Sequence, residues 1–586
     1  MLRHPLMMLS LAALGCAAPA FAQDTSSDSP PAGRAAVPVQ RGAFVSEAVT
    51  PHSFDGDLRH LPRAAAWQPG DPIKEIPRRR RAVAGLDSLA ALPERLHFDP
   101  LLDQQLEAEG QLTDPTFGTP LLNFTAQGFS GATPPDPSGD VGGDYFIQTI
   151  NSSAGGRFVI YEKTTGTITA GPTALETLGT GNCASGLGDA VVLYDNLASR
   201  WLLTEFSGVA NSLCVYVSKT SNPVTGGWWA YEFTTPTFPD YPKYGVWSDA
   251  YYVGANEDSP SLIALDRTKM LSGLAATMQR FTAPTTLSAF SFQMLAPVDH
   301  DGKLPPPPGS PGLFLRHNDD EAHSTPDVPG ADSLELFEFH VDWTTPANST
   351  LTGPIAIAMA EISSNFCGFT TFSCIPQPGT ANLDPLREVV MNKPAYRNRR
   401  GTEIIVGSLP TNVAATPAST TNAGVRWFEL RKTTGSYGLR QQGTLASPPC
   451  TGVCDFPQRW MSSTVMDAAG GIATAYNFAS DTTNHPGLRY SGRLASDPQG
   501  TLPQGEGLIV AGTASSSSNR YGDYNQLNVD DSGNGCTFFY TGEWNPAASW
   551  STRIASFEFA ACTTGSPVFS DGFELGSTAG WSLTLP

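Results

Sequence analysis

The chain alternates short apolar runs with polar turns, and residues 188–219 show this pattern most clearly. They read GDAVVLYDNLASRWLLTEFSGVANSLCVYVSK, with β-branched and aromatic runs at 191–194, 201–206 and 214–218. Asp, Asn, Gly and Ser separate the runs. Such runs between such turns are typical of strands, so the stretch predicts three strands joined by two turns.

The same plan returns along the whole middle of the chain. A strand, a turn carrying Asp and an aromatic strand recur at 139–151, 244–256, 462–478 and 526–540, and more weakly at 291–319 and 395–409. A further strand follows each hairpin, beginning near Phe158, Leu213, Ser261, Leu334, Val425, Gly487 and Thr552. Most of these units are spaced roughly 50 to 65 residues apart, a period that with about four strands per unit indicates a propeller. One such unit cannot bury both its faces, whereas seven packed radially can, so the sequence predicts an all-β, seven-bladed β-propeller.

The chain before residue 121 has a different composition. Residues 23–120 are rich in Ser, Pro, Ala and Gln and have poor strand patterning, which is typical of a poorly ordered pro-segment or linker. Leucines in 86–109 have some helical spacing, so this part could dock against the domain. Residues 121–124 could supply the strand that closes the ring. We therefore expect the propeller at 121–562 and a C-terminal tail at 563–586.

The first 22 residues have the pattern of a signal peptide. Arg3 and His4 give a basic start, residues 6–18 are apolar, and residues 20–22 read AFA, an A-x-A cleavage site. The mature chain would begin at Gln23 and be secreted. Cys16 leaves a lipoprotein anchor as an alternative, but Ala13 stands where a larger aliphatic residue is usual. No later stretch is long and apolar enough to span a membrane.

A basic run, Arg78 to Arg81, interrupts the N-terminal segment. It predicts either a processing site for a trypsin-like protease or a solvated stretch without a role. The chain as a whole is acidic, with a net charge of −20 and only 15% charged residues. Because phosphate binding needs clustered Lys and Arg, this composition argues against a nucleic-acid partner. We expect a monomer.

Nine cysteines leave eight once Cys16 is removed with the signal peptide, an even number in an exported chain. Proximity in the sequence favours four local disulfides: Cys183–Cys214, Cys367–Cys374, Cys450–Cys454 and Cys536–Cys562. The spacing of Cys450 and Cys454 would also fit zinc, but Pro and Gly surround them and no His is close.

Candidate ligand-binding residues lie just before the first strand of each unit. In a propeller this strand lines the central channel, so the residues that precede it should meet on one rim. Carboxylates, guanidinium groups and aromatic faces are what a sugar or a carboxylate ligand needs. The alternative is that the rim charges pair with one another and fix the angle between blades. The candidates are Asp140, Asp189, Lys243, Tyr396, Arg397, Arg459, Trp460, Arg520 and Asp523.

Calcium is the one cofactor that the sequence leaves open. Asp136, Ser138, Asp140 and Asp144 resemble the start of a calcium loop, but Val141 and Ile147 stand where an EF-hand has Gly and Glu.

Two enzyme classes also remain open. Asp140, Asp189, Asp240 and Asp523 could supply the carboxylate pair of a glycoside hydrolase. Tyr396, Arg397 and Arg459 would instead suit a polysaccharide lyase. The G-x-S-x-G, H-E-x-x-H and nucleotide-loop motifs are absent from the sequence, and no catalytic residue can be assigned.

Several segments resemble one group of proteins. LGDAVVLYDNLASRWLLTEF, FPDYPKYGVWSDAYYVGANE, FHVDWTTPANST, LASDPQGTLPQGE and CTFFYTGEW are similar to segments of exported bacterial β-propeller proteins of no established activity, and the tail resembles FSDGFESG-type tails. The resemblance covers most of 130–562 and implies the fold and export, without assigning catalytic residues. The sequence thus favours a secreted module that binds an extracellular glycan or protein through its rim face. The alternatives are a polysaccharide-degrading propeller enzyme and a cell-surface structural protein.

Overall fold

The computed structural model describes residues 37–78, 99–111, 117–288, 290–323, 332–369, 371–379, 382–399, 401–414, 421–448 and 455–562. The chain divides into two units between Val37 and Pro38, and the first unit is described only at Val37. Everything below concerns the second unit. The signal peptide, Arg79 to Arg81, the Cys450–Cys454 pair and the tail lie outside the described residues.

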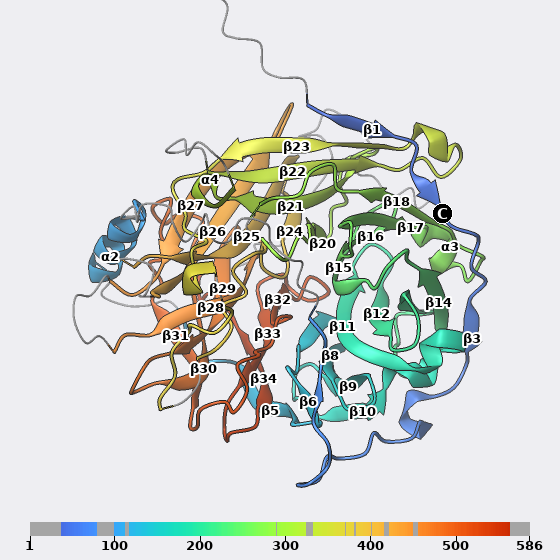
Figure 1. Ribbon diagram of the computed structural model, residues 1–586, viewed down its shortest axis with the longest axis horizontal. Coiled ribbons are helices and arrows are strands. Elements are labelled where there is room, and N and C mark those ends of the chain that lie inside the picture. Colours follow the sequence, from blue (N-terminus) through green and yellow to red (C-terminus); the bar gives the residue numbers. More distant parts are fainter. Residues whose placement is uncertain are drawn as a thin grey trace, which may run out of the picture. The chain divides into compact units, whose positions relative to one another are not determined.

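The second unit is a seven-bladed β-propeller, as the repeats predict (Figure 1). Each blade is an antiparallel meander whose first strand is innermost. Blade 1 has β7 (Ser138–Gly142), β8 (Tyr145–Asn151), β9 (Gly156–Glu162) and β10 (Ile168–Ala174). Blade 2 has β11 (Gly186–Asp195), β12 (Arg200–Ser207), β13 (Ser212–Ser218) and β14 (Trp228–Thr234). Blade 3 has β15 (Asp240–Val246), β16 (Tyr251–Asn256), β17 (Ser261–Leu265) and β18 (Met278–Thr282).

The remaining blades follow the same order, with one irregularity. Blade 4 has β19 (Ala296–Pro297), β21 (Gly312–Asn318), β22 (Ser333–His340) and β23 (Thr350–Ala358). Blade 5 has β24 (Ala395–Arg399), β25 (Thr402–Asn412), β26 (Ala423–Lys432) and β27 (Gly438–Leu445), and β20 (Asp299–Asp301) adds to β24 in parallel. Blade 6 has β28 (Gln458–Met466), β29 (Ile472–Ala479), β30 (His485–Arg493) and β31 (Glu506–Gly512). Blade 7 has β32 (Gln526–Val529), β33 (Phe538–Trp544) and β34 (Ser551–Phe557).

The ring is closed by a strand from the N-terminal side. β5 (Leu122–Gly128) pairs antiparallel with β34, with Leu122 opposite Ser556. The prediction for residues 121–124 is therefore confirmed, and the strand continues to Gly128. Because β5 supplies the outermost strand of blade 7, the last blade is completed by residues far from it in the sequence.

The segment before β5 contains strands that its composition does not predict. β1 (Val39–Arg41) pairs with β23, β2 (Phe44–Val45) with β18, and β3 (His52–Phe54) with β14. They form fifth, outermost strands on blades 4, 3 and 2, and β1 and β3 lie along the outer edge in Figure 1. β4 (Lys74–Glu75) pairs in parallel with β6 (Ala132–Thr133). These strands need no hydrophobic alternation, because the blade edges already offer backbone donors and acceptors.

Helices are short and lie between the strands. They are η1 (Leu58–His60), α2 (Leu102–Gln111), η2 (Leu175–Leu178), η3 (Gly181–Ala184), α3 (Arg267–Leu271), α4 (Asp320–His323), η4 (Pro346–Asn348) and η5 (Cys367–Phe369). α2 docks on blades 5 and 6, as expected for part of 86–109. Leu102 is buried, and Asp99, just before the helix, pairs with Arg426 at 2.8 Å. No helix within the described ranges is long and apolar enough to cross a membrane.

Large aromatic side chains fill the space between neighbouring blades. Trp201, Trp228, Trp247, Trp427 and Trp460 are each less than 2% exposed. Ring contacts also join blades that are not neighbours: Trp247, just after β15 of blade 3, and Tyr396 in blade 5 lie 4.7 Å apart, edge to face. Each such ring removes a large apolar area from water, which is the main term that holds blades together.

Three of the four predicted disulfides are confirmed. Cys183 joins Cys214, Cys367 joins Cys374, and Cys536 joins Cys562. The first ties η3 to β13 within blade 2, and the last ties the β32–β33 turn to the end of blade 7. Three local covalent links of this kind suit a chain folded in an oxidising compartment.

Candidate functional site

Bulges at the start of three innermost strands shape one end of the channel. The register of β11 against β12 shifts between Gly188 and Val191, and β15 and β28 shift at the equivalent place. Within the bulges Asp189, Tyr241 and Met461 have φ values of 51°, 52° and 48°. Left-handed backbone at non-glycine residues is strained and gathers at functional sites. This end of the channel is therefore the first place to look for a site.

The bulges bring charged and aromatic side chains of several blades together. The Lys243 ammonium lies over the Tyr524 ring, 3.9 Å from the centroid of Tyr241, and donates a hydrogen bond to the carbonyl oxygen of Asp523 at 3.2 Å. The Tyr524 hydroxyl donates to Oδ2 of Asp189 at 2.6 Å. We call Asp136, Asp189, Lys243, Asp523 and Tyr524 the channel cluster. The sequence predicted three of its members as ligand-binding candidates.

Burial shifts the titration of the channel cluster. It raises the pKa of Asp136 and of Asp189 to about 7, and in each case a neighbouring carboxylate adds to the shift. Burial also lowers the pKa of Lys243 well below its usual value, against the attraction of the carboxylates. Oδ1 of Asp189 and Oδ1 of Asp523 are buried and accept no hydrogen bond within the described part of the chain. Carboxylates with a pKa near neutrality are suited to general acid and base chemistry.

The N-terminal segment closes this end of the channel. Ile76 is 1% exposed, and its carbonyl oxygen accepts a hydrogen bond from Nη1 of Arg520 at 3.0 Å. The Arg78 guanidinium pairs with Asp384 from the loop between blades 4 and 5. A cleft of about 580 Å³ remains between residues 75–78 and Asn519 and Arg520. With the segment in place, the channel cluster is out of contact with solvent.

A larger groove opens beside this closure. It has a volume of about 740 Å³. One wall is aromatic: Phe129 stacks edge to face between Trp67 at 4.9 Å and Trp550 at 5.3 Å. Trp67 and Phe129 are half-buried, and Ile73 beside them is 58% exposed. Trp67 and Phe129 therefore keep part of their apolar surface exposed, whereas Trp550 is 4% exposed and packs behind Phe129.

Hydroxyl and amide groups also line the groove. They belong to residues 516–519, which read SSSN, and to Ser373 and Ser549. Two hydrogen bonds to Gln377 hold residues 516–519 in place. The Ser516 backbone amide donates to the Gln377 side chain at 2.7 Å, and that side chain donates to the Ser516 carbonyl oxygen at 3.0 Å. We call the whole feature the aromatic–serine groove. Among the described residues that line the groove, Glu75 is the one that carries a charge.

Arg520, another predicted site residue, lies beside Asp523 of the channel cluster at 3.7 Å. The remaining predicted site residues lie apart from the cluster and are engaged within the fold. Arg397 makes two hydrogen bonds to Asp531 at 2.8 and 2.9 Å, which link blades 5 and 7. Arg459 makes two to Glu506 at 2.8 and 3.0 Å within blade 6. These contacts agree with the alternative interpretation, in which the charged residues of the rim pair with one another and fix the angle between blades.

The remaining candidates are also buried. The Tyr396 hydroxyl donates to Glu403 at 3.1 Å, and the Trp460 ring packs on Tyr521 at 5.6 Å. Asp140 accepts a hydrogen bond from the Tyr194 amide at 2.8 Å. The sequence did not predict the groove residues Trp67, Phe129 and Trp550. Each is a single aromatic residue in a loop, whereas the other candidates were found from the repeated strand pattern.

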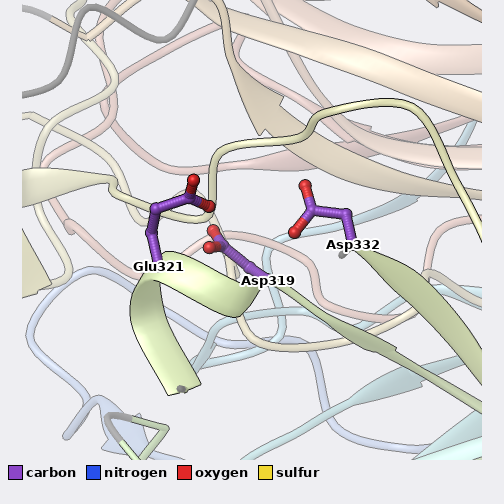
Figure 2. Close-up of side chains that lie close together, drawn as sticks. All are labelled: Asp319, Glu321 and Asp332. Atoms are coloured by element: carbon purple, nitrogen blue, oxygen red, sulfur yellow. The ribbon is translucent and has the colours of Figure 1, made fainter. Parts of the chain in front are cut away.

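The residues of the expected calcium loop do not form a group that could hold a metal ion. Asp136 accepts hydrogen bonds from the Asp523 amide at 2.8 Å and the Asn151 side chain at 2.7 Å. Among the residues that the structure describes, the group with suitable geometry is Asp319, Glu321 and Asp332 (Figure 2), whose nearest oxygens lie within 4.8 Å of one another.

This acidic group also serves the fold. Oδ2 of Asp319 accepts a hydrogen bond from the Ser364 amide and Oδ2 of Asp332 from the Ile362 amide, both at 2.6 Å. Burial and the neighbouring carboxylates raise the pKa of Asp332 and of Glu321. The group therefore anchors the chain after β23 to the start of β22, and holds protons that a cation would have to displace.

The solved structures that this chain resembles are distant neighbours. No protein-family model and no curated protein matches the sequence. Among solved structures, the Dos1 propeller is 11% identical, with a TM-score of 0.33, over 76% of this chain and 96% of that one. The α-L-arabinofuranosidase Arb93A from Fusarium graminearum is 7% identical, with a TM-score of 0.30, over 76% and 98%. The WD40 domain of SCAP from fission yeast is 9% identical, with a TM-score of 0.28, over 71% and 82%. Likeness at this level carries no functional argument.

Proposed function

We propose that the protein is an exported propeller that binds a neutral glycan in the aromatic–serine groove. The observation that carries the proposal is the pairing of the Trp67, Phe129 and Trp550 wall with the hydroxyl-bearing turn 516–519 around a volume of about 740 Å³. Export rests on the signal-peptide pattern of residues 1–22 and on the disulfides. The groove replaces the channel residues as the expected ligand-binding surface.

The chemistry of the groove matches both the apolar and the polar parts of a sugar. The C–H faces of a pyranose or furanose ring pack on aromatic rings, while its hydroxyl groups need donors and acceptors such as serine hydroxyls and an asparagine amide. A volume of about 740 Å³ is within the range of small-molecule sites. Glu75 and the net charge of −20 disfavour an acidic polymer, so we expect a neutral glycan.

Retention on immobilised polysaccharides tests the proposal. We expect retention on at least one neutral polysaccharide and none on acidic ones, with loss of retention in the Trp67→Ala and Phe129→Ala variants. Phe44→Ala is the matched control, because Phe44 is an aromatic residue 58% exposed on the outer edge of blade 3. Retention that survives both groove variants would refute the groove as the site.

A second candidate function is polysaccharide hydrolysis at the channel cluster. The observation that favours it is the pair of buried, unpartnered oxygens on Asp189 and Asp523, with the Asp189 pKa near 7. One carboxyl group would protonate the leaving oxygen and the other would act as nucleophile or base. Substrate could reach them only after residues 74–78 move. New reducing ends that disappear in Asp189→Asn would support hydrolysis, and retention without new ends would leave binding alone.

A further inference from the structure

The closure of the channel rests on one buried arginine side chain. Arg78 is 6% exposed and its partner Asp384 is 1% exposed. The guanidinium carbon lies 4.4 Å from the ring centroid of Phe372 and 5.5 Å from that of Phe292. A carboxylate with two aromatic faces is the arrangement by which proteins recognise a guanidinium group.

Several carboxylates surround Arg78, and two of them also pair with other arginines: Glu388 with Arg387 at 3.5 Å and Asp523 with Arg520 at 3.7 Å. Besides Asp384, the carboxylates of Asp523, Glu388 and Asp240 interact electrostatically with the guanidinium. Nε and Nη2 of Arg78 are buried and donate no hydrogen bond within the described residues. Arg78 thus occupies the pocket through one of its three nitrogens, and a guanidinium placed differently could make more hydrogen bonds there.

Within the described residues, the segment that carries Arg78 is held by a short backbone pairing, by polar contacts and by the packing of Ile76 on Ala132 and Phe206. β4 pairs with β6 over two residues, Lys74 donates to the Leu187 carbonyl oxygen at 3.0 Å, and Arg520 donates to Ile76 at 3.0 Å. The cleft of about 580 Å³ beside residues 75–78 leaves room for a second chain. A segment held in this way can be displaced by a competitor, because a two-residue parallel pairing has little stability of its own.

We propose that the pocket formed by Asp384, Phe372 and Phe292 is a binding site for an arginine side chain, and that Arg78 is its internal ligand. A partner peptide carrying arginine would compete with Arg78 for the pocket. Displacement of residues 74–78 would then bring Asp523 and Asp189 of the channel cluster into contact with solvent. Asp384, Phe372 and Phe292 do not line the aromatic–serine groove, although the displaced segment includes its lining residue Glu75. Failure of the arginine site in a test would therefore leave the glycan proposal standing.

Chemical complementation tests this proposal. Arg78→Ala vacates the pocket, and agmatine supplies a free guanidinium group. We expect agmatine to bind the variant saturably and raise its thermal midpoint, and to bind wild type at least about tenfold more weakly because Arg78 competes at high effective concentration. The matched controls are n-butylamine, which has a cation of the wrong shape, and the double variant Arg78→Ala/Asp384→Asn.

Two results would overturn the proposal. One is the absence of saturable agmatine binding to folded Arg78→Ala. The other is equal stabilisation by butylamine, or equal stabilisation of the Asp384→Asn double variant. If Arg78→Ala does not fold, wild type is titrated with a labelled tetra-arginine peptide instead. Binding that agmatine competes away and that Asp384→Asn weakens at least about tenfold would support the proposal, and no such binding would refute it.

Discussion

The Tyr524 hydroxyl donates a hydrogen bond of 2.6 Å to Oδ2 of Asp189, across 335 positions of sequence. Asp189 belongs to the bulge in the innermost strand of blade 2, and Tyr524 lies in the connection that leads into blade 7. The bond therefore joins two parts of the ring that no strand pairing connects, and it holds one oxygen of a carboxyl group whose other oxygen accepts nothing in the described chain.

Removing that hydroxyl should destabilise the propeller. In Tyr524→Phe the Asp189 carboxyl group loses its side-chain donor and stays buried, so we expect the free energy of unfolding to fall by about 1–3 kcal/mol. Urea denaturation at pH 7 measures the change. Tyr145→Phe, at a half-buried tyrosine of β8, is the control and should change the free energy by less than about 0.5 kcal/mol. Equal effects of the two variants would contradict the role of the bond.

The raised pKa of Asp189 predicts how stability depends on pH. Its folded value of about 7 exceeds the usual value of 3.8, so the folded protein binds a proton that the unfolded chain has released. The contribution is fully present below about pH 4 and is lost as the pH rises through about 7.

Asp189→Asn should abolish this contribution. The free energy of unfolding of wild type should fall relative to that of the variant between pH 5 and pH 7, at no more than about 1.4 kcal/mol per pH unit. Urea denaturation at pH 5, 6, 7 and 8 gives the two curves. Asp144→Asn, at an exposed aspartate, should run parallel to wild type. Parallel curves for Asp189→Asn as well would contradict the prediction.

We expect Arg397 to stabilise the fold and not to bind ligand. Its guanidinium is buried, paired with Asp531 and bonded to the Met466 carbonyl oxygen at 2.9 Å. Arg397→Ala leaves Asp531 buried without its partner, so we expect a loss of about 3–5 kcal/mol in the free energy of unfolding. Arg59→Ala, at an exposed ion pair, should leave the free energy of unfolding close to that of wild type. A stable Arg397→Ala protein with impaired ligand binding would instead restore Arg397 as a ligand-binding candidate.

The disulfides should differ in their effect on stability. Cys183–Cys214 closes a loop of 31 residues in sequence separation, and Cys367–Cys374 one of 7. Because the entropy that a cross-link removes from the unfolded chain grows with loop length, we expect Cys183→Ala/Cys214→Ala to cost about 3–4 kcal/mol and the other double variant less. Thermal unfolding of the two double variants compares them. The reverse order would contradict this entropic account.

The blades could be predicted because their strand pattern repeats along the sequence. The aromatic–serine groove could not, because its residues lie outside the repeated pattern. A strand such as 201–206 can be predicted from its own residues, because a buried strand is rich in apolar side chains in every blade. The strands β1 to β3 depend on edges built by other blades, so their own residues carry little signal. Asp189 and Lys243 were predicted from charged residues that recur near the start of each innermost strand, and the structure places them within β11 and β15, at the bulges. Trp67 and Phe129 meet only in the folded chain.

The most direct test of the central claim is the affinity of the groove for a neutral oligosaccharide. Isothermal titration would use an oligosaccharide released from whichever neutral polysaccharide retains the protein, against wild type, Trp67→Ala and Phe44→Ala. The account predicts saturable binding by wild type and Phe44→Ala, and at least about tenfold weaker binding by Trp67→Ala, because a ring that stacks on ligand is worth more than about 1 kcal/mol. Unchanged affinity in Trp67→Ala, or no binding by wild type, would contradict it.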